Sequence, residues 1–251
     1  MALKKRIMLW DIESYIYRAC ASCKELVEVK PFIFQEQYNL KNGIDYINTT
    51  RDRLAKKVKA SKIIVALGAD TNFRKSVYPQ YKEGRKPKPL MYELLLDYIL
   101  NTFEVYSLPT LEADDVISVI ATDPSMGDNE LVVVTIDKDL KTIPNVELLR
   151  DLDKDSDIEW ISQDYAEYNL YYQTIAGDPT DGYKGVPGFG TIKTSDWLRN
   201  NPSCTLDDIK QLYIDNTGSD EGFAINYRLA KLVSFDEYDF EKGEVKNVKY
   251  N

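Results

Sequence analysis

Short apolar runs alternate with helix-length segments along the first two-thirds of this chain. The runs that read as strands are Arg6–Trp10, Ile63–Leu67, Val105–Leu108, Leu131–Ile136 and Val146–Leu149. The segments between the first four runs that read as helices are 12–27, 43–60, 90–102 and 112–122. Near-continuous apolar strands separated by helices are typical of a parallel sheet with both faces covered. The alternation therefore predicts an α/β fold with a central, twisted, mainly parallel sheet flanked by helices.

From about residue 160 the pattern changes to helices joined by glycine-rich turns. These helices are predicted at 162–176, 191–200, 205–215 and 221–233. We therefore expect an α/β core over 1–160 and a helical region over 161–251, with a C-terminal tail that packs on the core as irregular chain or short strands.

No apolar run approaches the ~20 residues that cross a bilayer, and the N-terminal apolar run is too brief for a secretory signal. We expect a cytoplasmic protein without a membrane partner.

Acidic residues follow four successive strands, at the points where the strands end. They are Asp11, Asp70, the group Glu112, Asp114 and Asp115, and the pair Asp137 and Asp139. One acid after one strand is an ordinary helix cap or turn. Parallel topology, however, brings all four strand ends to the same edge of the sheet. We therefore expect these carboxylates to share a small volume.

The segment GDPTDGYKGVPGFG, residues 177–190, adds Asp178 and Asp181 and then a run of glycines between two predicted helices. Such a loop is typical of a helix–hairpin–helix, in which backbone N–H groups at the start of the second helix bind a DNA phosphate. Most glycine- and proline-rich loops are plain turns, but this one directly follows two acids. The residues expected to contact DNA there are Lys184, Gly185, Val186, Gly188, Gly190 and Lys193.

The chain contains no histidine, which excludes Ser-His-Asp and Cys-His catalysis and histidine-based zinc sites. Its three cysteines are too few to bind zinc alone, and we expect Cys20 and Cys23 to be reduced residues of a helix.

Seven or eight carboxylates in one pocket raise one another's pKa, so they stay ionised together only around multivalent cations. Oxygen ligands favour Mg²⁺ or Mn²⁺. Two such ions about 4 Å apart clamp a phosphodiester undergoing hydrolysis.

The net charge of −9 by itself argues against a nucleic-acid partner. Positive charge is nevertheless concentrated in a segment at about 71–90, directly after Asp70. Its cationic residues are Arg74, Lys75, Lys82, Arg85, Lys86 and Lys88, against one acid, Glu83. A solvated loop is the ordinary explanation, but the position beside the acids favours a basic arch that contacts phosphates.

These features together resemble the 5′-nuclease superfamily, which includes flap endonucleases and the 5′-nuclease domain of bacterial DNA polymerase. The resemblance covers residues 5–235, and two stretches are similar to the replication exonucleases of T7-like bacteriophages. The motifs that carry it are Asp11, F-R-K-x-x-x-P-x-Y-K-x-x-R (73–85), L-E-A-D-D (111–115), T-x-D-K-D-L (135–140) and G-D-x-x-D-G-x-x-G-V-P-G-x-G (177–190).

The resemblance implies a PIN-like core that binds two Mg²⁺ or Mn²⁺ ions, and K⁺ at the helix–hairpin–helix. The implied ligands of the first ion, direct or through water, are Asp11, Asp70, Glu112 and Asp114, with Asp115 close by; those around the second are Asp137, Asp139, Asp178 and Asp181. Lys82 and Arg85 correspond to arch residues that stabilise the scissile phosphate, and Arg74 to a cation at the arch base. Glu13 matches no family role, and we expect it to be structural.

The implied activity is a 5′–3′ exonuclease on duplex DNA ends and on RNA in RNA–DNA hybrids, for primer removal or DNA degradation in a phage. A flap endonuclease remains the alternative within the family. Outside it, one alternative is a DNA-binding accessory protein without catalysis, although every metal-binding acid of the pattern is present. The other alternative is a haloacid-dehalogenase-type phosphatase. Those enzymes have the motif Asp-x-Asp after the first strand, whereas this chain has Glu13 two residues after Asp11.

Overall fold

The computed structural model describes residues 4–246, and its centre is a six-stranded sheet of order β5-β4-β1-β6-β7-β8. The strands are β1 (Arg6–Asp11), β4 (Lys62–Ala66), β5 (Val105–Tyr106), β6 (Glu130–Thr135), β7 (Val146–Arg150) and β8 (Ile158–Ile161). Neighbouring strands pair in parallel except β7 and β8, which are antiparallel. The mainly parallel sheet is therefore confirmed. The edge strand β8 was not predicted, and β5 is shorter than the predicted strand.

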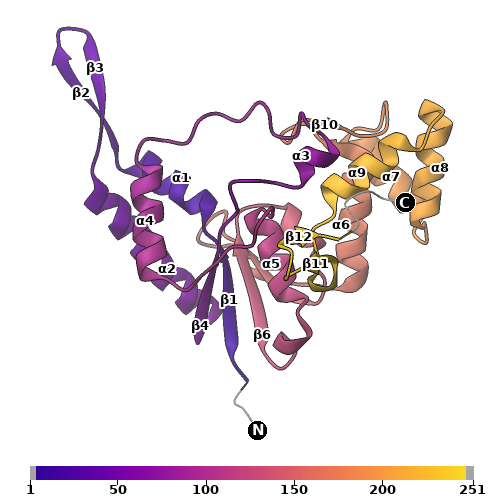
Figure 1. The fold of residues 1–251 in the computed structure, drawn as a ribbon, viewed down its shortest axis with the longest axis horizontal. Helices are drawn as coiled ribbons and strands as arrows, with labels where there is room; N and C mark the ends of the chain where they lie inside the picture. Colours follow the sequence, from indigo (N-terminus) through magenta and orange to yellow (C-terminus); the bar gives the residue numbers. More distant parts are fainter. Residues whose placement is uncertain (1–3, 247–251) are drawn as a thin grey trace.

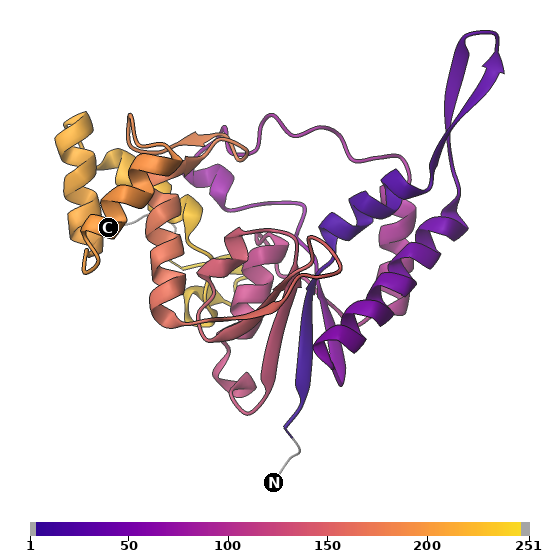
Figure 2. The same cartoon turned by 180° about the vertical axis from the view of Figure 1, so that it is seen from behind.

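Helices cover both faces of the sheet (Figures 1 and 2). On one face lie α1 (Glu13–Ser22), α2 (Leu40–Val58) and α4 (Tyr92–Thr102); on the other lie α5 (Ala113–Ala121) and α6 (Gln163–Ala176). Successive residues of β1 alternate between the two cores, as the pleat of a strand requires. Met8 and Trp10 pack in the cluster with α1, α2 and α4, whereas Ile7 and Leu9 pack in the cluster with α5. This burial on both faces explains the continuous apolar run.

The predicted helix 12–27 is wrong beyond Ser22. Residues 24–38 form an antiparallel hairpin of β2 (Lys24–Lys30) and β3 (Ile33–Tyr38), which projects from the body (Figure 1). Pro31 follows β2 directly and lies in the turn that joins the two strands. The residues around Val27 and Val29 favour a strand. Cys20 lies in α1 and Cys23 just after it, and both are buried free thiols.

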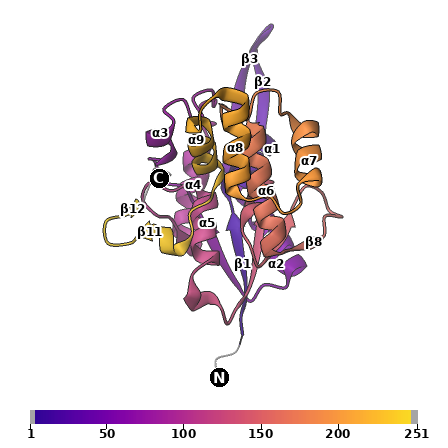
Figure 3. The same ribbon diagram turned by 90° about the vertical axis from the view of Figure 1, so that its right-hand side faces the viewer.

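The chain after residue 160 is mainly helical, as expected, and α6 is followed by α7 (Thr191–Asn200), α8 (Leu206–Thr217) and α9 (Glu221–Ala230) (Figure 3). These helices share their own apolar cluster. The tail forms two short strands, β11 (Tyr238–Asp239) and β12 (Glu244–Val245), which pack in the same core as α5. The predictions for the first three and last five residues lie outside the described part of the chain.

Several short elements complete the fold. The remaining helix is α3 (Arg74–Val77), and the remaining strands are β9 (Gly177–Asp178) and β10 (Tyr183–Lys184). Single 3-10 turns occur at Pro124–Met126, Asp139–Thr142 and Phe235–Glu237. Within residues 4–246, no helix is both long and apolar enough to cross a membrane.

Candidate active site

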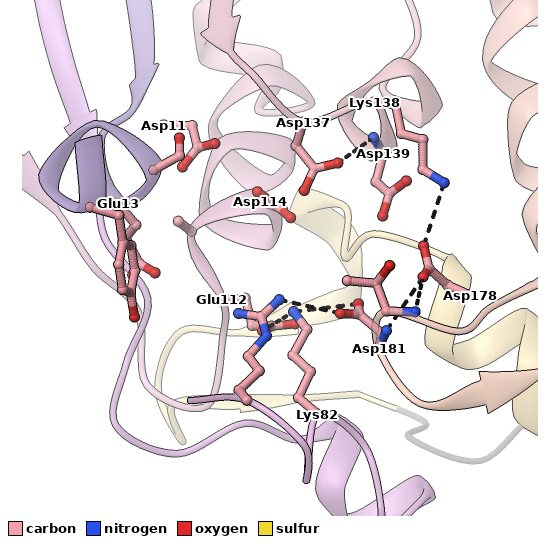
Figure 4. Close-up of a pocket in the computed structure, with 15 residues that line it drawn as sticks. Asp11, Glu13, Lys82, Glu112, Asp114, Asp137, Lys138, Asp139, Asp178 and Asp181 are labelled. Carbon is pink, nitrogen blue, oxygen red and sulfur yellow. Dashed lines mark hydrogen bonds and ion pairs between the residues drawn. The ribbon is translucent and has the colours of Figure 1, made fainter. Parts of the chain in front are cut away.

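A cavity of about 280 Å³ lies at the carboxyl ends of the central strands (Figure 4). Its walls come from the end of β1, the start of α5, the turn after β6, the loop between α6 and α7, and the arch segment that follows α3. The lining residues are Asp11, Glu13, Ser14, Tyr17, Lys82, Arg85, Glu112, Ala113, Asp114, Asp137, Lys138, Asp139, Asp178, Thr180 and Asp181. Seven of the nine acids predicted to bind metal therefore line one cavity.

The structure does not bring Asp70 and Asp115 to this cavity. Asp70 is exposed on the loop after β4. Asp115 is fully buried, and both of its oxygens accept hydrogen bonds from the Arg74 guanidinium, at 2.5 and 2.8 Å. Asp115 also accepts from the backbone N–H groups of Val233 and Glu112.

The Arg74–Asp115 pair therefore lies in the protein interior rather than at the cavity surface. The sequence places Asp114 and Asp115 equally close to the strand end, but a helix turns adjacent side chains in different directions. Asp114 lines the cavity, whereas Asp115, at the third position of α5, turns back to the helix start and the core. Arg74, predicted to belong to the catalytic set, is 2% exposed, and its guanidinium lies 3.4 Å from Oε2 of the cavity acid Glu112.

Buried polar groups hold several of the cavity acids in place. The Thr135 hydroxyl donates to Asp11 Oδ2 at 2.7 Å, and the Gln173 side-chain amide donates to Asp139 Oδ1 at 2.9 Å. The Tyr81 hydroxyl lies 2.9 Å from Glu112 Oε2 and 3.0 Å from Asp181 Oδ2. Thr135 and Tyr81 stand in the motifs that carry the resemblance, but the sequence assigned no role to any of these three groups.

Glu13 lines the cavity as well, which the sequence did not predict. One of its oxygens accepts from the Gly68 N–H at 2.9 Å, so the carboxylate links the start of α1 to the loop after β4. Its position two residues after Asp11, in the first turn of the following helix, was the available signal.

Basic side chains reach the same acids. Lys82 Nζ lies 2.5 Å from Glu112 and 3.5 Å from Asp181, and the Arg85 guanidinium lies 3.2 Å from Asp181. Lys138 lies 3.6 Å from Asp178.

Within residues 4–246, no three acidic or thiol side chains converge closely enough to form a ready-made metal site. The donor set nevertheless fits Mg²⁺ or Mn²⁺, because it consists of carboxylates alone. Ligation by Glu112, Asp178 and Asp181 would require these side chains to exchange their basic partners for metal.

The cavity shifts the pKa of its acids in opposite directions. Burial, with repulsion from neighbouring carboxylates, raises the pKa of Asp11 and the pKa of Asp139 to about 7, and the pKa of Asp114 well above its usual value. Glu112 is also buried, but the charges of Lys82 and Arg74 outweigh this effect and lower its pKa to about 2. The first three acids therefore favour protonation unless positive charge is added beside them.

These shifts predict how stability depends on pH. In the folded state Asp11 and Asp139 hold protons up to about pH 7, whereas the unfolded chain releases them near pH 4. The folded state therefore binds more protons in this window and loses stability as pH rises through it. We expect the free energy of unfolding in EDTA to be lower at pH 8 than at pH 6, by about 1 kcal/mol per group. Urea titrations will measure it.

Added Mg²⁺ should reverse this loss, because it binds the ionised carboxylates of the folded state. The matched comparison is the same pair of titrations with Mg²⁺ in place of EDTA. Equal stability at the two pH values in EDTA would contradict the raised pKa values, and no effect of Mg²⁺ at pH 8 would contradict metal binding by these carboxylates.

The predicted DNA-contacting residues lie in two places. Lys75 and Lys86 are exposed on and after α3, in the arch segment. Lys184 and Lys193 are exposed around the loop between α6 and α7, and Gly188 and Gly190 are exposed within that loop.

Two of the residues predicted to contact DNA in this loop are constrained by packing. Val186 is 2% exposed, and its N–H donates to Ile175 O, so neither its side chain nor its amide is free for DNA. Gly185 is required by packing, because a Cβ there would lie 2.0 Å from Ile175 O.

Residues 6–168 match the family model described as 5′-3′ exonuclease, N-terminal resolvase-like domain. The exonuclease of Escherichia phage T7 is 40% identical over 149 residues, 57% of this chain and 48% of that protein. The exodeoxyribonuclease of Enterobacteria phage T3 is 39% identical over 146 residues, 56% of this chain and 47% of that protein. The chain thus spans about half the length of these curated relatives.

Solved structures of phage T5 proteins share the fold. The T5 5′-exonuclease with zinc bound superimposes with a TM-score of 0.65 at 21% identity, over 91% of this chain and 90% of that one. The T5 flap endonuclease in a complex with DNA and metal ions gives a TM-score of 0.67 at 20% identity, over 91% and 89%. Together with the acid-lined cavity, the match over residues 6–168 shows that this chain belongs to the 5′-3′ exonuclease family.

Proposed function

We propose that this protein is a divalent-metal-dependent 5′–3′ exonuclease that hydrolyses phosphodiesters at the 5′ ends of duplex DNA. One observation carries the proposal: seven carboxylates from separate parts of the chain line a single cavity that also contains Lys82 and Arg85. The similarity to the T7 exonuclease supports the same activity. RNA in RNA–DNA hybrids is a further proposed substrate, in phage replication within the host cytoplasm.

The cavity residues divide into two proposed metal-binding groups. Asp11, Glu112 and Asp114 would hold one Mg²⁺ or Mn²⁺, and a second would lie among the acids listed here: Asp137, Asp139, Asp178 and Asp181. Divalent ions of this kind lower the pKa of a bound water and neutralise phosphate charge. The described residues of the cavity include no thiol, hydroxyl–base pair or imidazole suited to covalent catalysis. The side chains therefore act by binding and by electrostatics.

Lys82 and Arg85 have a separate role in this proposal. Both lie at the cavity beside Glu112 and Asp181, and Arg85 is 58% exposed, so it can reach a substrate phosphate. Cations placed where negative charge develops lower the barrier of phosphoryl chemistry. The exposed residues Lys184, Lys193, Gly188 and Gly190 would bind the duplex backbone at the start of α7, with K⁺ as a proposed aid.

Replacing Lys82 with alanine is expected to lower the turnover number by roughly 100-fold while the affinity for duplex DNA changes little. The reason is that the Lys82 side chain is 13% exposed and its ammonium lies beside the cavity acid Glu112, so in this proposal it would contact the reacting phosphate and little of the rest of the duplex. Single-turnover cleavage and DNA binding in Ca²⁺ will separate the two effects. Lys86→Ala is the matched control: it removes an exposed arch lysine, and we expect weaker binding with unchanged turnover. An unchanged turnover in Lys82→Ala would remove Lys82 from the catalytic set.

A digestion assay with 5′-labelled substrates tests the proposed activity itself. We expect Mg²⁺-dependent release of mononucleotides or short oligonucleotides from a blunt duplex. Release of the whole single strand from a 5′-flap substrate, with little attack on the blunt duplex, would favour a flap endonuclease. Binding of either substrate without cleavage in Mg²⁺ or Mn²⁺ would indicate an accessory protein and refute the proposal.

A further inference from the structure

Thr135 lies between the two groups of cavity acids. It is the last residue of β6, and β6 pairs in parallel with β1 so that Val134 lies opposite Trp10. Thr135 and Asp11 are therefore neighbours at the ends of the two central strands. The Thr135 side chain has no exposed surface. Its hydroxyl can meet only groups of the protein.

The Thr135 hydroxyl both donates and accepts a hydrogen bond. The Thr135 O–H donates to Asp11 Oδ2 at 2.7 Å, and its oxygen accepts from the Asp137 N–H at 2.8 Å. Asp137 Oδ1 in turn accepts from the Asp139 N–H at 3.0 Å. Since a hydroxyl has a single proton to donate, the N–H of Asp137 leaves Asp11 as the acceptor of that proton. A continuous chain of hydrogen bonds thus joins Asp11 to Asp137 and Asp139.

We propose that Thr135 is a positioning residue that holds Asp11 and the Asp137 turn in the mutual arrangement needed to bind two divalent ions. This inference rests on the proposed function. Asp11 is on β1 and Asp137 follows β6, so no covalent constraint fixes the distance between the two carboxylates. The Thr135 hydroxyl supplies that constraint. Groups that orient metal ligands in this way contribute roughly 10- to 100-fold to metal affinity.

The ordinary explanation is that Thr135 serves only the strand. Threonine is β-branched and suits a buried strand end. Valine would then serve equally well, because it has the same shape and a higher strand preference. The two explanations therefore differ in what removal of the hydroxyl alone does to metal binding.

The test is the affinity of the purified protein for Mn²⁺, measured by isothermal titration calorimetry at fixed pH. We expect Thr135→Val to weaken Mn²⁺ binding roughly 10- to 100-fold. Thr135→Ser, which keeps the hydroxyl, should stay within a few-fold of wild type. Thr174→Val is the matched control, because Thr174 is equally buried but donates to Leu170 O inside α6. It should bind Mn²⁺ like wild type.

Each outcome decides a separate question. Wild-type Mn²⁺ affinity in Thr135→Val would overturn the inference, as would equally weak binding in Thr135→Ser, since the hydroxyl would then not be the cause. If Thr135→Val does not fold, Thr135→Ala compared with Thr135→Ser isolates the hydroxyl in the same way. If the wild-type protein itself binds no Mn²⁺, the proposed function fails rather than this inference.

Discussion

Replacing Asp137 with asparagine is expected to slow cleavage of 5′-labelled duplex DNA by roughly a thousandfold in Mg²⁺. Asparagine keeps the shape of the side chain and an oxygen that can accept from the Asp139 N–H, now at 3.0 Å from Asp137 Oδ1. It removes only the negative charge that the proposed metal site needs. Binding to duplex DNA should remain measurable, because the exposed lysines of the arch and of the α6–α7 loop are unchanged.

Asp128→Asn is the control for this experiment, since it makes the same chemical change on an exposed turn before β6. Cleavage by that variant should equal wild type. Should Asp137→Asn also cleave at the wild-type rate, the assignment of metal ligands around this cavity would be wrong. Thermal unfolding of both variants in EDTA will show that the comparison is made on folded protein.

Replacing Asp115 with alanine is expected to reduce the free energy of unfolding by about 3 to 5 kcal/mol. The change leaves the Arg74 guanidinium, 2% exposed, without its bidentate partner. It also removes the acceptor for the Val233 N–H, through which α5 is joined to the chain after α9. Urea unfolding in EDTA will measure the loss without any contribution from metal binding.

Two further variants make this result specific. In Arg74→Met/Asp115→Leu both charges are gone, and much of the stability should return, because apolar groups replace a buried ion pair at little cost. Asp70→Ala removes an exposed acid and should change stability by less than about 0.5 kcal/mol. If Asp115→Ala is as stable as wild type but loses Mn²⁺ affinity, Asp115 acts as a metal ligand, and its assignment to the interior is mistaken.

The sheet and most of the cavity were predictable because local patterns encode them. Strands buried on both faces read as apolar runs, and the rule that parallel strands end at one edge places their acids together. The choice between Asp114 and Asp115 was not predictable, since it depends on how α5 is rotated against the sheet. The hydrogen bond between Thr135 and Asp11 was not predictable either, because only the pairing of β1 with β6 brings the two residues together.

The hairpin at 24–38 was missed for a different reason. The predicted helix ran to residue 27, whereas α1 ends at Ser22, and the few residues between these two ends contain no strong helix-stop signal. Both faces of the β2–β3 hairpin are largely exposed, so neither face requires apolar residues. The alternation of apolar and polar residues that indicates a strand is therefore weak in β2. The net charge of −9 was a poor guide to binding for a separate reason, because an average over the chain does not describe the cationic segment at about 71–90.

Anomalous diffraction from crystals soaked in Mn²⁺ tests most directly whether these carboxylates form a metal site. We expect two peaks inside the cavity, one beside Asp11 and Asp114 and the other beside Asp137 and Asp178, with Lys82 moved away from Glu112. The absence of any peak among these side chains, in crystals with Mn²⁺ bound elsewhere on the protein, would contradict a metal-dependent nuclease site at this edge of the sheet.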